Sequence, residues 1–202
     1  MSPSRPRRSL RLVLPALLAT LAAACTTPPP LPPGADNPGL TDRGLREANP
    51  LDVAVLEVEN QTGIGGLPLA SMRRQFHAGL VERHYSPLAL DYVDGRAVEA
   101  GYRPGASEEN ALLKVVVTGW DDQHWKTHAR LVIDADVWLL DATRPAPEQA
   151  LWGGHVSRTM EMGRTREVVV GESQLLERTV ADFVAEVLAS LPARRPELAS
   201  AR

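Results

Sequence analysis

The sequence predicts an α/β domain with a mixed β-sheet and the element order β-α-β-α-β-β-β-α. Three observations in the chain predict this fold class. Residues 51–83 contain a short apolar strand and then an amphipathic helix, which is how a parallel sheet begins. Residues 111–160 alternate between apolar and polar side chains, which indicates an antiparallel meander with one covered face. A long helix near the end of the chain has an apolar stripe wide enough to pack on the sheet.

The first half of the predicted sheet lies between residues 51 and 100. Residues 51–59 are β-branched and apolar in the middle, as in a buried strand. The glycine-rich loop 63–66 lacks the lysine and hydroxyl residue of a phosphate-binding P-loop, so it is interpreted as a turn. A helix is predicted from Pro68 to about Arg83, because apolar residues recur at intervals of three and four, namely Leu69, Met72, Phe76 and Leu80. A second strand is predicted at 88–93 and a weak helix at about 95–100.

The meander is predicted as three strands, at residues 111–121, 128–141 and 151–160. The middle strand alternates most clearly, with one apolar face and an opposite face that carries Arg130, Asp134, Asp136 and Trp138. Residues 122–127 are expected to form a hairpin connection. Residues 168–170 are open to two interpretations, a fourth strand or an apolar loop. The long amphipathic helix is predicted from about Glu172 to Leu191.

Residues 1–24 have the features of an export signal. Four arginines precede an apolar run that ends in the small residues Ala22-Ala23-Ala24. The run is shorter than the roughly 20 residues that a helix needs to cross a bilayer, so the segment is expected to be removed. General export and twin-arginine export both stay open, because Arg7-Arg8 forms an arginine pair.

The only cysteine, Cys25, directly follows these small residues. Leu21-Ala22-Ala23-Ala24-Cys25 resembles the lipobox of bacterial lipoproteins, in which the cysteine receives a diacylglyceryl group, with palmitate as a typical acyl chain. We therefore expect Cys25 to be the lipid attachment site; the alternative is a secretory signal followed by an unmodified thiol. Thr26 resembles the pattern of lipoproteins that are sorted to the outer membrane.

The remaining chain is predicted to contain a tether, one domain and a tail. Residues 25–50 are rich in proline and lack apolar periodicity, so a disordered tether is expected there. Residues 51–193 are assigned to a single α/β domain and residues 194–202 to a frayed tail. Removal of the signal takes away four positive charges and changes the net charge from −3 to −7. This acidic balance argues against nucleic acid as a partner.

Three groups of residues are candidates for a functional site. His124 and His128 would supply zinc ligands if they lay on a helix, but a hairpin does not bring them together, so exposed polar residues are favoured. Asp134 and Asp136 share a strand face, and without a nucleophile or a basic orienting group they are interpreted as solvated carboxylates. A possible partner surface in or beside the meander consists of Trp120, Trp125 and Trp138. No catalytic residue, metal or cofactor is expected.

Short motifs in the predicted strands and turns resemble a known family. They are Val53-Ala54-Val55-Leu56 with Asn60, then Glu99-Ala100-Gly101-Tyr102, Leu139-Leu140-Asp141 and Leu151-Trp152-Gly153-Gly154. With these motifs the chain resembles small proteobacterial outer-membrane lipoproteins that are related in fold to the TolB amino-terminal domain and the curli-secretion lipoprotein.

The resemblance implies a non-enzymatic lipoprotein that is anchored in the outer membrane through Cys25 and faces the periplasm. It implies an auxiliary or assembly role in an envelope transport or secretion system, with transporter or secretion subunits as protein partners; an oligomer is possible. The alternative is a lipid-anchored enzyme or ligand-binding protein with a cleft near Asp134 and Asp136 or near His124 and His128.

Overall fold

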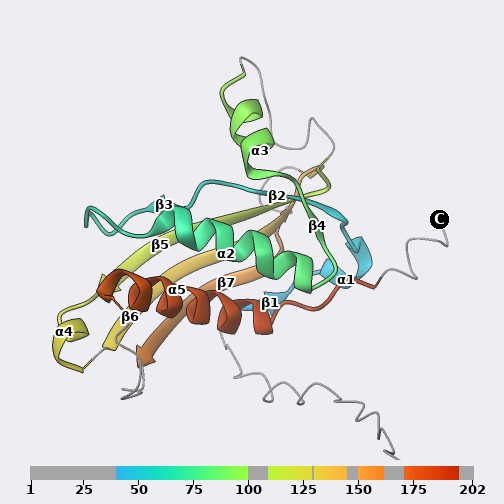
Figure 1. Ribbon diagram of the computed structural model, residues 1–202. Coiled ribbons are helices and arrows are strands. Elements are labelled where there is room, and N and C mark those ends of the chain that lie inside the picture. Colours follow the sequence, from blue (N-terminus) through green and yellow to red (C-terminus); the bar gives the residue numbers. More distant parts are fainter. Residues whose placement is uncertain (1–39, 100–108, 129, 145–149, 162–170, 196–202) are drawn as a thin grey trace, which may run out of the picture. The chain divides into compact units, whose positions relative to one another are not determined.

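The computed structural model describes residues 40–99, 109–128, 130–144, 150–161 and 171–195 (Figure 1). Residues 1–39 lie outside the described part, and with them the predicted signal, Cys25 and most of the predicted tether. Residues 168–170 also lie outside it, so their two interpretations stay open. Within the described ranges, no helix combines the length and the apolar character that a membrane span requires.

In the described part of the chain, seven strands form one mixed sheet. The order across the sheet is β1-β7-β6-β5-β2-β4, and β3 pairs separately with β5. Pairing is parallel between β2 and its neighbours β4 and β5, and antiparallel in the meander β5-β6-β7 and between β7 and β1. The strands are β1 Thr41–Asp42, β2 Asp52–Val55, β3 Glu59–Asn60, β4 Ser86–Pro87, β5 Ala111–Asp121, β6 Arg130–Asp141 and β7 Ala150–Glu161. The predicted fold class, a mixed α/β sheet with a meander, is confirmed.

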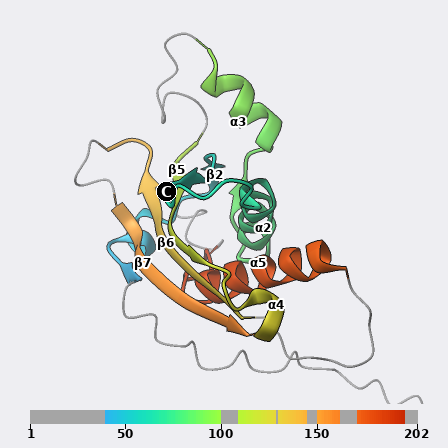
Figure 2. The same ribbon diagram turned by 90° about the vertical axis from the view of Figure 1, so that its left-hand side faces the viewer.

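The two longest described helices cover the same face of this sheet (Figure 2). Helix α2 buries Met72, Phe76 and Leu80, which confirms the apolar periodicity of this segment, and α5 buries Phe183 and Val187. These side chains pack in one core with the apolar residues that alternate along the meander strands. The described helices are α1 Leu45–Ala48, α2 Leu69–Glu82, α3 Leu90–Ala97, α4 Trp125–His128 and α5 Glu172–Ala189.

A β-bulge in β5 changes which side chains face the core. Val117 pairs with Ala135, but the next registered pair is Gly119 with Asp134, so β5 contains one additional residue at this point. Beyond the bulge the alternation is reversed, and Trp120 is buried with the core although its parity predicts the opposite face. The expected exposure of Trp120 on a partner surface is therefore wrong, because strict alternation along a strand holds only where the register is continuous.

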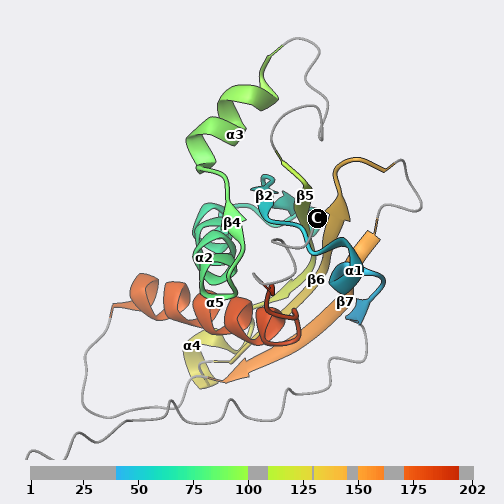
Figure 3. The same ribbon diagram turned by 90° about the vertical axis from the view of Figure 1, so that its right-hand side faces the viewer.

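The second predicted strand, at 88–93, is corrected by the structure. The strand next to β2 is β4, which comprises only Ser86 and Pro87, and α3 begins at Leu90 (Figure 3). A short apolar run does not distinguish a strand from a helix by periodicity alone. Here Val93 packs from the helix on Ala54 and Leu112, which form a small second cluster on the other face of the sheet.

The sequence predicts that the folded domain begins at Leu51, but in the structure it begins earlier. Strand β1 pairs with β7, and α1 buries Leu45, which is 2% exposed. Asp42 holds the connection between β1 and α1, because its Oδ1 accepts hydrogen bonds from the backbone N–H groups of Gly44 and Leu45. Elements of two and four residues have no periodicity to detect, since long-range contacts rather than local propensity stabilise them.

The segment that follows α5 is bonded to the segment that follows α2. The Tyr85 hydroxyl donates a hydrogen bond to the carbonyl oxygen of Pro192 (2.8 Å), and the backbone N–H of Arg194 donates one to the carbonyl oxygen of Arg83 (3.0 Å). Burial raises the pKa of Tyr85 to about 12, and the nearby Arg83 guanidinium partly opposes this shift. Arg194, which the sequence assigns to the frayed tail, is thus attached to the domain.

Candidate interaction surface

The meander has a face that α2 and α5 do not cover, and it carries the polar candidates of the sequence. We call it the open face and define it by Lys114, Asp134, Asp136, Trp138, His155 and Ser157. These residues belong to three neighbouring strands and are aligned by the register: Lys114 lies opposite Trp138, Asp136 opposite His155, and Asp134 opposite Ser157. The alternation of β6 places its polar members here, as the sequence predicts.

Two polar side-chain contacts cross the open face between neighbouring strands. The Nδ1 atom of His155 lies 2.9 Å from the Oδ1 atom of Asp136, and the Nζ atom of Lys114 lies 2.9 Å from the Oε1 atom of Glu59. All four side chains are well exposed, so each pair contributes at most about 1 kcal/mol to stability. The partner of Asp136 could not be read from the sequence, because it depends on the register between β6 and β7.

The geometry does not combine Asp134 and Asp136 into an acid–base pair. Asp136 is engaged by His155, whereas Asp134 forms no ion pair with any residue that the structure describes. A carboxylate next to an imidazole can orient a general base, but that chemistry also needs a nucleophile bonded to the imidazole. Within the described ranges, the His155 ring is bonded only to Asp136.

The three tryptophans predicted as a partner surface do not lie together on the outside. Trp120 and Trp125 are each 8% exposed and belong to the main core, so for these two the prediction is wrong. Trp138 lies on the open face and is partly exposed. Its position opposite Gly153 leaves room for the indole, because glycine has no side chain to compete for the space.

His124 and His128 lie on a helical turn and not on an extended hairpin. The backbone N–H of His128 donates to the carbonyl oxygen of His124 (2.9 Å), and the two ring centroids are 5.7 Å apart. The hairpin predicted for residues 122–127 is therefore corrected: the connection contains α4. In the described residues, no three potential ligands of the types His, Cys, Asp and Glu come together.

A broad cavity lies at the end of the sheet next to α1, away from these candidates. Its volume is about 1010 Å³, and its lining includes Arg46, Asn110, Asp141, Arg144 and Arg194. A smaller hollow of about 350 Å³ lies between β7 and α5 and is lined in part by Glu161, Asp182 and Glu186. Neither lining includes Asp134, Asp136, His124 or His128, so neither cavity is the cleft that the alternative function requires.

Comparisons with known proteins give a fold and no family. The sequence matches no protein-family model and no curated protein. Among solved structures, the PelC dodecamer from Paraburkholderia phytofirmans is similar to this chain, with 19% identity and a TM-score of 0.50; the match covers 77% of this chain and 96% of that one. At this identity the similarity shows a common fold.

Two further solved structures are similar at lower scores. The lipoprotein GNA1162 from Neisseria meningitidis is 19% identical with a TM-score of 0.44, over 70% of this chain and 99% of that chain. A DUF4136 family protein from Bacteroides thetaiotaomicron is 9% identical with a TM-score of 0.37, over 75% and 91%. Structures similar to this chain thus include a lipoprotein, while the relationship to the TolB amino-terminal domain and the curli-secretion lipoprotein stays a prediction.

Proposed function

We propose that this chain is a lipid-anchored envelope protein that works without enzymatic activity, as an assembly component of a larger machine. In this proposal it is held at the outer membrane through Cys25, faces the periplasm and binds copies of itself and other envelope proteins. A transport or secretion system is the proposed machine, on the strength of the family that the sequence motifs resemble.

The observation that carries the assembly role is the fold shared with PelC, whose structure is a dodecamer. The match covers 77% of this chain and 96% of the PelC chain. A subunit of a closed homo-oligomer needs surfaces that complement one another. The open face offers paired charges and the partly exposed Trp138 for such contacts.

Lipid anchoring is supported by the sequence around Cys25. The small residues before it and the basic, apolar segment further upstream are those of a lipoprotein signal. An acyl group on this residue would hold a protein at a membrane without a spanning helix. Thr26 supports sorting to the outer membrane.

A non-enzymatic role is supported by the placement of the polar candidates. Asp136 pairs with His155 on a well-exposed strand face, and the cavity of about 1010 Å³ lies elsewhere. Catalytic groups generally lie in a concave, partly desolvated site, where electrostatic interactions are strong. The exposed pairs of the open face suit recognition of a protein surface better than they suit chemistry.

The anchor is tested with the full precursor and its Cys25→Ala variant. We expect the wild-type protein in the outer-membrane fraction and the variant in a soluble periplasmic or precursor fraction. Metabolic labelling with a fatty acid should mark only the wild-type protein. A variant that stays in the outer-membrane fraction would show that Cys25 is not the anchor.

The assembly role is tested by size and by crosslinking in cells. Analytical ultracentrifugation of the soluble Cys25→Ala variant should reveal an oligomer, and a monomer at every concentration would contradict self-assembly. A photo-crosslinking residue at Ser157, on the open face, should capture a second copy or an envelope protein more often than one at Ala78, which is exposed on α2. Equal capture at both positions would remove the open face as the contact surface.

A further inference from the structure

We infer that His124 and His128 form a binding site for a late first-row transition-metal ion of the class Zn²⁺, Ni²⁺ or Cu²⁺. An extended hairpin would separate two residues that are four positions apart. In the structure the two residues share a helical turn instead, since His124 directly precedes α4 and His128 is its last residue. The inference is independent of the assembly role proposed above.

The helical turn places the two imidazoles side by side. Residues four apart on a helix lie one above the other, and the bond from the His128 N–H to the His124 carbonyl oxygen (2.9 Å) shows that the turn is formed. The ring centroids are 5.7 Å apart with the planes nearly perpendicular, at 78°. Two nitrogens bound to one ion at about 2.0–2.1 Å are roughly 3 Å from each other, which a small rotation of either exposed ring provides.

A threonine between the histidines contacts one of the two rings. The Thr127 hydroxyl oxygen lies 2.8 Å from the Nδ1 atom of His128 and 3.5 Å from the carbonyl oxygen of His124. When this oxygen accepts a hydrogen bond from Nδ1–H, the Nε2 atom of His128 presents its lone pair to an ion. A hydrogen bond from the other ring nitrogen is the usual companion of a histidine that ligates a metal.

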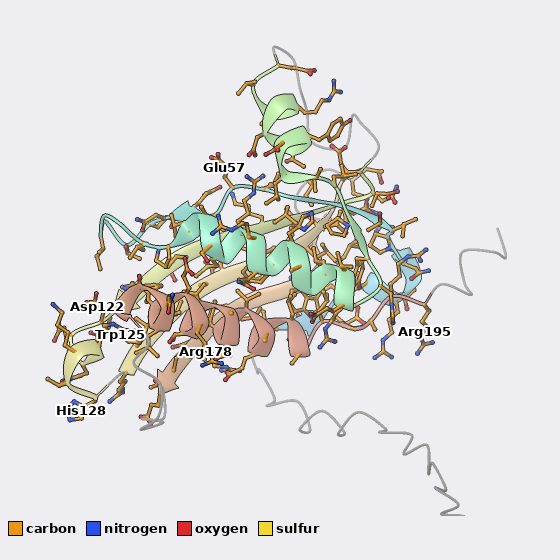
Figure 4. All side chains as sticks on the ribbon, in the orientation of Figure 1. Glu57, Asp122, Trp125, His128, Arg178 and Arg195 are labelled. Atoms are coloured by element: carbon orange, nitrogen blue, oxygen red, sulfur yellow. The ribbon has the colours of Figure 1, made fainter. Side chains whose placement is uncertain are left out.

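The turn is held rigidly on the sheet by the residue between the two ligands. Trp125 is 8% exposed and packs in the main core, and its backbone N–H donates to the carbonyl oxygen of Asp122 (2.9 Å). Figure 4 shows Trp125 and His128 at α4, far from Arg195 at the other end of the sheet. Trp125 thus fixes α4 while both histidines stay exposed to solvent.

The donor set selects the class of ion. Two neutral imidazoles suit zinc, nickel and copper, whereas magnesium and calcium prefer oxygen ligands. Because no three potential ligands come together in the described part of the chain, the remaining coordination positions are assigned to water. The site therefore binds an ion through two protein ligands.

The test uses the tag-free Cys25→Ala protein and isothermal titration with Zn²⁺, Ni²⁺ and Cu²⁺ in turn. We expect one ion per chain, and at least about tenfold weaker binding in His124→Ala and in His128→Ala, because each variant loses the second of two linked ligands. Thr127→Val should also weaken binding, by about tenfold, since the hydrogen bond that orients His128 is lost. Circular dichroism of each variant verifies that it is folded.

A matched control is the variant His77→Ala, His84→Ala, which removes two histidines elsewhere and should bind as the parent protein does. Unchanged binding in His124→Ala, His128→Ala would overturn the inference, as would the absence of binding for all three ions. Equal weakening in the control pair would also overturn it, because the ion would then not be located at α4.

Discussion

The guanidinium carbon of Arg43 lies 5.1 Å from the centroid of the Trp138 ring. Arg43 belongs to the connection between β1 and α1, whereas Trp138 lies in β6, two strands away across the sheet. The backbone N–H of Arg43 also donates to the carbonyl oxygen of Leu151 in β7 (2.7 Å). Arg43 thus attaches the N-terminal edge of the domain to β7 and to β6, the middle strand of the meander.

The first prediction concerns this contact. Arg43→Ala should lower the free energy of unfolding by about 0.5–1 kcal/mol, the range of a cation–π contact at an exposed site. Urea unfolding followed by tryptophan fluorescence measures it. Arg46→Ala, which removes an exposed ion pair with Asp42, is the control and should cost less. If both variants lower the free energy of unfolding equally, the contact between Arg43 and the Trp138 ring stabilises the protein no more than an exposed ion pair does.

The second prediction concerns Gly153, whose backbone φ of +130° favours glycine. A Cβ atom at this position would lie 2.0 Å from the carbonyl oxygen of Val137 in the adjacent strand, so Gly153→Ala must displace backbone. It should lower the free energy of unfolding by more than about 1 kcal/mol. Gly65→Ala, where a Cβ meets nothing within 4 Å, should change stability little by the same urea assay. A tolerated Gly153→Ala would show that β6 and β7 can separate locally.

The third prediction concerns Arg73, which continues the hydrogen-bond ladder of β2 beyond the end of β4. The N–H groups of Ser86 and Leu88 donate to the carbonyl oxygens of Leu51 and Val53, and the guanidinium of Arg73 donates to the next one, that of Val55, through Nε (3.0 Å) and Nη2 (2.8 Å). Arg73→Met leaves this buried carbonyl without its donors and should cost about 1–3 kcal/mol.

The matched variant for Arg73 is Asp94→Asn. It weakens the ion pair that Arg73 forms with Asp94 (2.7 Å) but keeps both bonds to Val55. Since Asp94 is about half exposed, this change should cost at most about 1 kcal/mol. Chemical denaturation of the two variants decides between the contacts: a cost for Asp94→Asn as large as that for Arg73→Met would place the stabilisation in the ion pair.

The fourth prediction concerns pH. The pKa of Tyr85 is raised to about 12 in the folded protein, above the ordinary value of about 10 for tyrosine, because burial disfavours the phenolate. The folded state therefore holds this proton more tightly than the unfolded state does. The stabilisation is complete below pH 10 and is lost as the pH rises toward 12, and its full size is about 2–3 kcal/mol.

The pH prediction is checked by comparing unfolding of the wild-type protein and Tyr85→Phe at pH 9 and pH 11.5. The wild-type protein should lose more stability over this interval than the variant, because the variant has no phenol to ionise at this position. Tyr92→Phe is the matched control, because it removes the hydroxyl group of a tyrosine that is 42% exposed. Parallel pH profiles for all three proteins would contradict the raised pKa.

The meander could be predicted from the sequence because its two faces meet different surroundings. In β6, Leu131, Ile133 and Ala135 pack in the core, whereas Asp134 and Asp136 lie on the open face. Apolar and polar residues therefore alternate along this strand with a period of two. The same reason explains the agreement for α2 and α5, where an apolar stripe recurs at the helical period.

The features that could not be predicted depend on contacts between distant residues. The bulge between Val117 and Gly119 adds one residue to β5 and turns Trp120 toward the core, which alternation alone cannot predict. The turn α4 is too short to have a periodicity, so the proximity of His124 and His128 was missed. The pair of Asp136 with His155 follows only from the register between two strands, and the lengths of their connections do not determine it.

Strand β1 and helix α1 also determine where the chain can be shortened. A truncated protein that starts at Leu51 would uncover the edge of β7 beside Trp152 and Gly153 and would leave a void where Leu45 packs. Unprotected strand edges pair readily with other chains, so such a fragment should precipitate. A soluble fragment has to begin no later than Leu40, which is partly buried against the core.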